Sequence, residues 1–253
     1  MSTTVDAKRV RCAAPGALAC LAAAACLAAS GCGRLAAHGL NAEGVRLFEQ
    51  ARYDEAIQHF DRAVYRDPAN ADAYYNLASA YHRKGIQAGD PGTLRQAERY
   101  YHMARDRDPD HRESHRGLAV LLAEQGRSEE AFRLLQGWAD RRPASPEPKV
   151  ELARLMEEHG DRRAAEEHLL SALAMDSGHT RALVALGRLR EESGSYGQAL
   201  ENYQRALAAD RFQPAVAARV GALQSTVGPQ RTLTAPPSNG NTRIVGGASA
   251  TLR

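Results

Sequence analysis

A repeat of about 34 residues runs through the middle of this chain and limits what it can fold into. Small residues recur at one repeat position, namely Gly44, Ala78, Ala119, Ala153 and Gly187, and at a second, namely Ala56, Ala97, Ala131, Ala165 and Ala199. A bulky residue follows the second series by four positions, at Phe60, Tyr101, Leu135, Leu169 and Tyr203. Amphipathic helices require only a spacing of about 3.6 residues, so five units in one register indicate stacked repeats rather than a chance bundle.

Each unit has the pattern of two amphipathic helices joined by a tight turn. In the second unit the apolar spacing predicts helices over 73–84 and 94–107. An insertion over 86–92 makes the spacing 41 residues once. Glycines stand where the first helix should end in a positive-φ residue, at Gly85, Gly126, Gly160 and Gly194. Helix-breaking prolines close the first three units, at Pro68, Pro109 and Pro143.

Such units must stack on one another to bury their apolar faces. Neither helix can bury its apolar face alone, but five stacked units, sealed by a helix from 214 to about 224, would form one continuous core. We therefore expect an all-α fold.

The units resemble the tetratricopeptide repeat family. The run 73–81, AYYNLASAY, with Gly85 after it, matches the first helix of that family. The run 53–57, YDEAI, followed by Phe60, Ala63 and Pro68, matches the second helix. The resemblance covers 37–227 and implies a right-handed superhelical solenoid of about five helix-turn-helix units plus a C-terminal capping helix. Trp138 departs from the pattern, because the other units have alanine there, so its ring should either widen the packing or protrude.

The resemblance also implies that the first helices line an inner face that binds a protein or peptide partner. Chaperone-binding members of the family hold the terminal carboxylate of a peptide with Lys, Arg and Asn side chains. Asn76 fits that pattern, but Glu113 and Gly117 stand where basic groups are needed. A chaperone-type terminal carboxylate is therefore disfavoured as the ligand. Arginine can hold a carboxylate and an aromatic ring can anchor an apolar side chain. A solvated scaffold face explains the same residues equally well. The candidate groove residues are Phe48, Tyr75, Asn76, His82, Arg83, Arg116, Arg154 and Arg188.

The amino terminus has the pattern of an export signal. Lys8, Arg9 and Arg11 precede a weakly apolar run over 17–29, which is shorter than the ~20 residues that a membrane-spanning helix needs. The run ends in LAASGC, 27–32, which resembles the bacterial lipobox and implies that Cys32 becomes an acylated amino terminus. A permanent membrane anchor and a secreted protein cleaved after an alanine remain as alternatives. If the cell has two membranes, the periplasmic face of the outer one is favoured.

The predicted organisation therefore has four parts: a signal peptide over 1–31, a short tether over 32–36, the solenoid with its capping helix over 37–227, and a disordered tail over 228–253. The tail is rich in Gly, Pro, Ser, Thr and Asn. Its segment IVGG, 244–247, resembles the activated amino terminus of trypsin-like proteases, but no such domain follows. A β-strand recognition segment there is an alternative to a plain spacer.

Composition and motifs argue against catalysis and nucleic-acid binding. The net charge of +3 comes from the chain ends, and 32–227 carries about −2. His111 and His115 are placed wrongly for a zinc-protease motif and lack a third ligand, and no cofactor motif occurs. All four cysteines lie within the first 32 residues, so the repeats form no internal disulfide.

The sequence thus predicts a non-catalytic adaptor, lipid-anchored in the cell envelope, that docks an envelope protein or assembly such as a pilus, secretion or cell-wall complex. The alternative is a structural scaffold that self-associates through Trp138 or the insertion beside Gly92. A hydrolase is the least favoured class.

Overall fold

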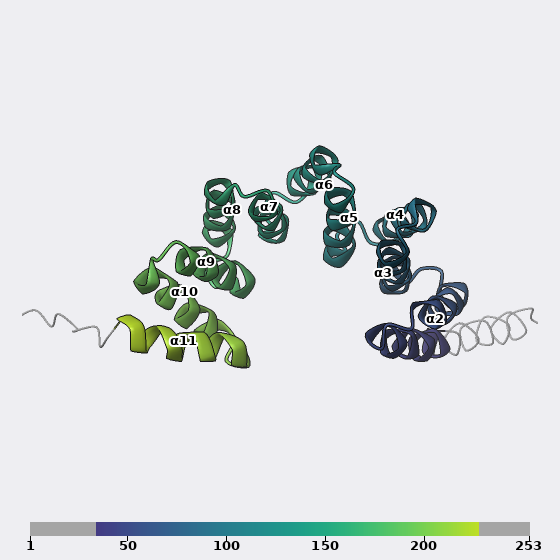
Figure 1. The fold of residues 1–253 in the computed structure, drawn as a ribbon, viewed down its shortest axis with the longest axis horizontal. Coiled ribbons are helices and arrows are strands. Elements are labelled where there is room, and N and C mark those ends of the chain that lie inside the picture. The colour runs from purple at the N-terminus through teal and green to yellow at the C-terminus, as the bar shows by residue number, and fades with distance from the viewer. Residues whose placement is uncertain (1–33, 228–253) are drawn as a thin grey trace, which may run out of the picture.

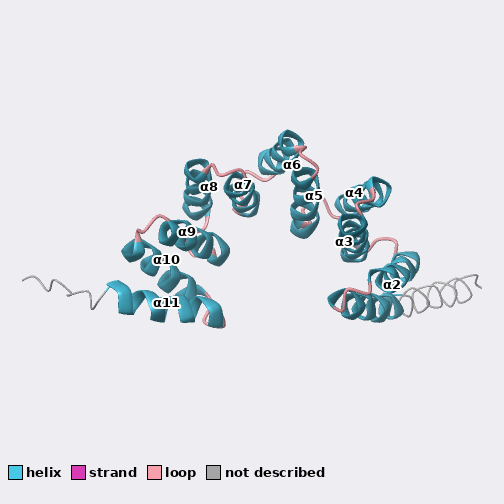
Figure 2. Cartoon of the chain, viewed as in Figure 1, coloured by secondary structure: helices cyan, strands magenta, loops and turns pink. Residues whose placement is uncertain are grey.

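A computed structural model of the chain describes residues 34–227, and these residues form helices and connecting turns without any strand (Figure 2). The first helix covers 34–49. The others are α2 (Tyr53–Arg66), α3 (Ala71–Ala88), α4 (Pro91–Arg107), α5 (Arg112–Glu124), α6 (Ser128–Arg141), α7 (Glu147–Glu158), α8 (Arg162–Met175), α9 (Thr180–Glu192), α10 (Tyr196–Ala209) and α11 (Pro214–Val227).

The helices form five antiparallel pairs and a final single helix, as the repeat predicted. The pairs follow an arch, with the first helix of each pair toward its inner side and α11 covering the last pair (Figure 1). First helices of neighbouring units also touch directly, α3 with α5 and α5 with α7. The expectation of an all-α solenoid with a capping helix is therefore confirmed. Within 34–227, no helix combines the length and the apolar character needed to cross a bilayer.

The two small series and the bulky series form the core. All five alanines of the second small series are fully buried, and the bulky residues are at most 4% exposed. A side chain at Gly44 would place its Cβ 2.5 Å from the ring of Phe60, and one at Gly187 would place it 2.7 Å from the ring of Tyr203. Small residues are thus required where the paired helices cross, because the aromatic ring occupies the space beside the backbone.

The turns confirm three of the four predicted helix-ending glycines. Gly126, Gly160 and Gly194 have φ of 74°, 80° and 79°. Gly85 was predicted wrongly: it lies inside α3, which continues to Ala88 and ends at Gly89 with φ 60°. The insertion lengthens both helices instead of forming a loop, because Asp90 caps α4 at the backbone N–H groups of residues 92 and 93, and Pro91 begins the helix. Gly85 serves packing, since a Cβ there would lie 2.6 Å from Leu94.

The first unit makes the same turn without glycine. Ala51 occupies the repeat position of Gly126 and has φ 58°. The backbone N–H of Arg52 donates to the carbonyl of Leu47 at 3.0 Å, as that of Arg127 does to Leu122 at 2.8 Å. The shared hydrogen bond stabilises the turn in both units, and Ala51 adopts a left-handed conformation that is unfavourable for a residue with a Cβ.

Trp138 does not protrude. Its side chain is 2% exposed and its indole stacks on the His115 ring, with centroids 4.3 Å apart and planes 2° from parallel. The hypothesis that Trp138 forms a self-association surface is therefore wrong, because the ring is buried in the core of the third unit. The insertion beside Gly92 remains at the surface.

Part of the expected tether lies within the described residues. Residues 34–36 are helical, consistent with the high helix propensity of Arg34, Leu35 and Ala36. Cys32, the signal peptide and the tail with its 244–247 segment lie outside the described residues and stay predictions.

Candidate partner-binding face

Three adjoining hollows lie along the inner side of the arch, where the first helices of the units meet. The N-terminal hollow has a volume of about 570 Å³ and is formed by the helix over 34–49, α3 and α5. The middle hollow, about 300 Å³, lies between α7 and α9, and the C-terminal hollow, about 600 Å³, lies between α9 and α11. Six predicted groove residues line the N-terminal hollow: Phe48, Tyr75, Asn76, His82, Arg83 and Arg116. Arg154 and Arg188 line the middle hollow instead, which Arg116 also borders.

Aromatic rings form the apolar part of the N-terminal hollow. Phe48 meets Tyr53 edge-on, with ring centroids 5.4 Å apart. Tyr75 lies between Tyr101 and His111, at 6.1 Å and 5.6 Å. Both Phe48 and Tyr75 are half-buried, so each is held by neighbours and still presents ring surface to the hollow.

A chain of polar contacts supports the wall behind these rings. His82 pairs through Nε2 with Glu124 at 2.7 Å, and its Nδ1 lies 3.3 Å from the Tyr101 hydroxyl. That hydroxyl lies 3.3 Å from Ser79 Oγ. Burial lowers the pKa of His82 and raises that of Tyr101. Ser79 gains no activated base from this arrangement, because the tyrosine between it and His82 holds its own proton firmly. These polar contacts instead hold the Tyr101 side chain in position.

Arg83 and Arg116 are exposed and differ from the other arginines of the inner face. Across the described part of the chain, neither forms an ion pair or a side-chain hydrogen bond. Asn76, by contrast, donates to Asn41 Oδ1 at 3.0 Å. The N-terminal hollow therefore presents two guanidinium groups whose hydrogen-bond donors are available to a ligand.

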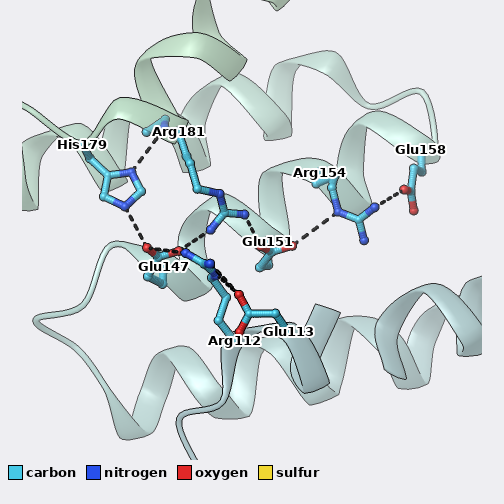
Figure 3. Close-up of polar contacts among 9 residues, drawn as sticks. Arg112, Glu113, Glu147, Glu151, Arg154, Glu158, His179 and Arg181 are labelled. Atoms are coloured by element: carbon cyan, nitrogen blue, oxygen red, sulfur yellow. Dashed lines mark hydrogen bonds and ion pairs between the residues drawn. The ribbon is translucent and has the colours of Figure 1, made fainter. Parts of the chain in front are cut away.

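Apart from Arg116, the arginines that border the middle hollow already have carboxylate partners, and Figure 3 shows Arg154 and Arg181 among them. Arg154 binds Glu151 at 3.3 Å and Glu158 at 2.7 Å, and Arg188 pairs with Glu157 and Glu192. The two predicted groove residues of this region are thus largely neutralised within the fold.

A buried carboxylate anchors this ion-pair network. Glu151 is 1% exposed and pairs with both Arg181 and Arg154. Arg181 also binds Glu147 at 2.5 Å, and Glu147 accepts from His179 at 3.1 Å. The hydrogen bond from His179 and the charges of Arg181 and Arg112 lower the pKa of Glu147. The network ties α5, α7 and α9 together.

Sequence reasoning missed this network, although a signal was available. Glu113, Glu147 and Arg181 occupy one repeat position in consecutive units. Side chains at one repeat position form a row along the solenoid, so opposite charges in such a row predict an ion pair between units. Reading the repeat for charge as well as for small and bulky residues would have found it.

The histidines of the rejected zinc motif serve the fold. His111 caps α5 by accepting the Ser114 N–H at 3.2 Å, and its Nε2 lies 2.9 Å from Asp72. His115 is fully buried and its Nε2 lies 2.9 Å from the carbonyl of Pro109. Among residues 34–227, no three His, Cys, Asp or Glu residues gather to hold a metal ion.

Two family models match the chain. A TPR repeat model matches 44–85, and a tetratricopeptide repeat model matches 86–146 and 150–214. The chain belongs to the tetratricopeptide repeat family. The matched ranges begin in the first helix and end at Pro214, the first residue of α11, so they include residues of all five pairs.

A solved structure supports the tetratricopeptide fold. A thermophilic TPR protein of Thermus thermophilus superposes with a TM-score of 0.54 at 23% identity, covering 75% of this chain and 100% of that one. The pilF protein of Pseudomonas aeruginosa reaches 0.49 at 17% identity, covering 77% and 86%. A comparison with curated proteins found no significant match. Tetratricopeptide proteins are generally non-catalytic adaptors that bind other proteins, and this protein has the fold of that class.

Proposed function

We propose that this protein is a non-catalytic adaptor that holds a segment of a partner protein in the N-terminal hollow and tethers it to a membrane surface. The observation that supports this most is the gathering of six inner-face residues, two of them half-buried aromatics, around one hollow of about 570 Å³. A hollow with apolar anchors and a few polar groups is what an extended segment requires.

The tether is a separate part of the proposal. Cys32, acylated after removal of 1–31, would attach the solenoid to the cell envelope, with the outer membrane favoured where there are two. Attachment raises the local concentration of whatever the hollow holds, so modest affinity suffices. The partner on this view is an envelope protein or assembly, such as a pilus, secretion or cell-wall complex.

Site-specific photo-cross-linking in intact cells tests the binding face. A benzoylphenylalanine replacing Tyr75 should capture one protein reproducibly, because that side chain faces the hollow. Tyr65, an 83% exposed residue of α2 outside the three hollows, provides the matched control and should capture far less of that protein. Capture of the same proteins from both positions would place binding elsewhere. Capture of this chain alone would support the self-associating scaffold.

Fractionation tests the tether. Cys32→Ala should release the protein from membranes, because acylation requires the thiol. Retention of the variant as an uncleaved precursor would support a permanent membrane anchor, and release of the unmodified protein would support simple secretion.

A further inference from the structure

Seven arginines border the three hollows, and they divide into two groups. Five of them pair with carboxylates of the fold: Arg112, Arg154, Arg181, Arg188 and Arg219. The remaining two, Arg83 and Arg116, have no carboxylate within 4.0 Å in the described residues. Both are in the N-terminal hollow. The fold thus neutralises five of these seven basic groups, and both exceptions border the hollow that contains Tyr75 and Phe48.

The repeat shows that both arginines depart from their rows. At the position of Arg83 the other four units have glutamate, namely Glu49, Glu124, Glu158 and Glu192. At the position of Arg116 the other units have uncharged residues, namely Asn41, Tyr75, Val150 and Val184. Neither arginine is needed by the repeat itself, because four units form the same helix pair without it. The two departures also come from different helices, α3 and α5, and line one hollow.

Resting on the adaptor function above, we propose that the N-terminal hollow binds an extended protein segment that carries an apolar side chain and, near it, one or more carboxylates. The apolar side chain lies against Phe48 and Tyr75, and Arg83 and Arg116 bind the carboxylates. Arginine suits this role because its planar donors match a carboxylate with two parallel hydrogen bonds. The ligand differs from that of the chaperone clamp, whose basic positions are here Glu113 and Gly117.

Carboxylates that border the hollow limit how acidic the segment can be. Glu49, exposed on the helix over 34–49, borders the hollow and has no ion pair within 34–227. A carboxylate near Glu49 would be repelled, whereas an apolar or basic residue there would not. Glu124 of α5 also borders the hollow, so a uniformly acidic segment fits less well than one that combines apolar and acidic side chains.

Selection from a random dodecapeptide phage library against the purified full chain tests the proposal. The selected pool should be enriched in Asp and Glu beside an aromatic or aliphatic residue. The double variant Arg83→Gln/Arg116→Gln should lose the acidic enrichment. Arg99→Gln should keep it, because Arg99 is an equally exposed arginine of α4 outside the three hollows.

Affinity measurements with the strongest selected peptide complete the test. Each of Arg83→Gln and Arg116→Gln should weaken binding about tenfold or more, because a charge-assisted hydrogen bond is lost. Arg116→Lys should recover part of the loss, and raising the salt concentration should weaken the native complex by screening it.

The outcomes separate the two proposals. This inference is overturned if the selected peptides are not acidic, or if acidic peptides bind equally well after both arginines are replaced. Either result leaves the adaptor function standing. Equal loss of binding in Arg99→Gln also overturns it, since the attraction would then be nonspecific. No enrichment of any peptide overturns peptide binding in this hollow, and the adaptor function placed there fails with it.

Discussion

The two halves of the inner face use the same repeat positions in opposite ways. In the N-terminal half, first helices are joined by the Asn41–Asn76 hydrogen bond and by the contact of His82 with Glu124, and two arginines have no carboxylate partner among the described residues. In the C-terminal half, arginines and glutamates satisfy one another around Glu151. The comparison teaches that charge on a solenoid face has two uses. Paired charge fixes neighbouring units, and unpaired charge remains available to a ligand.

The comparison also changes which variants report on binding. Arg154 and Arg116 look alike as predicted groove residues, but Arg154 contacts Glu151 and Glu158 while Arg116 contacts no carboxylate of the described chain. Reversing the charge of Arg154 would therefore disturb the fold before it reported on a partner. Only changes at Arg83 and Arg116 separate binding from stability.

The largest expected effect is in the C-terminal half. Arg181→Ala should lower the free energy of unfolding by about 2–4 kcal/mol, because buried Glu151 keeps only Arg154 and Glu147 loses its 2.5 Å partner. Denaturant unfolding followed by circular dichroism measures this. Arg163→Ala is the control, since Arg163 is 91% exposed and pairs only with Glu167, so it should cost less than about 0.5 kcal/mol. Equal losses of stability in the two variants would show that the ion pairs around Glu151 stabilise the fold no more than an exposed pair does.

Acidification should weaken the junction between the halves first. Burial lowers the pKa of His115 from 6.5 to about 4. Between these values the unfolded chain binds more protons than the folded one, so stability should fall as the pH is lowered from 6.5 to 4, on the order of 2–3 kcal/mol. His82 acts in the same direction. The Glu147 pairs should be lost only below pH 4.5, because the pKa of that carboxyl is lowered from 4.5.

Unfolding curves at several pH values measure this prediction. His115→Gln retains a donor for the Pro109 carbonyl but has no titrating ring, so its stability should change less between pH 6.5 and 4. An unchanged slope in this variant would show that other groups set the acid sensitivity.

A smaller effect is expected at the turn of the first unit. Ala51→Gly should raise the free energy of unfolding by about 0.5–1 kcal/mol, because glycine adopts φ 58° without a Cβ penalty. The reciprocal control, Gly160→Ala at φ 80°, should lower it by about 1 kcal/mol, since the site is open and only backbone strain is added. Thermal melts of both variants measure the pair. A loss of stability in Ala51→Gly would mean that the first turn is not strained.

The smallest effect is expected where binding is proposed. Arg83→Gln and Arg116→Gln should each change the free energy of unfolding by less than about 0.5 kcal/mol, because both side chains are exposed and have no ion pair within the described residues. The same denaturant titration used for Arg181→Ala measures this. A loss comparable to that of Arg181→Ala would show that these arginines support the fold, and would end their use as reporters of a ligand.

Much of the fold was predictable, and the errors have physical causes. The small and bulky series located the core because helix crossings accept only certain volumes, as at Gly44 beside Phe60. Gly85 misled because a glycine at a helix end and a glycine at a helix contact look identical in a sequence. Trp138 was left open between widening and protruding, since only the packing around His115 shows that the core accepts the ring.

The sequence predicted which residues lie on the candidate binding face, but not which of them form ion pairs between units. Helical phase placed seven of the eight residues on the inner side, and the family resemblance added Asn76, because the 34-residue period and the 3.6-residue helical repeat are local properties of the chain. Which arginine meets which carboxylate depends on how neighbouring units are rotated and spaced, and that is a property of the stacked units. The sequence shows a glutamate four residues after Arg154 and after Arg188, but not that Arg188 also meets Glu157 of the preceding unit. In the folded protein, within residues 34–227, these two arginines are paired, whereas Arg83 and Arg116 lack carboxylate partners.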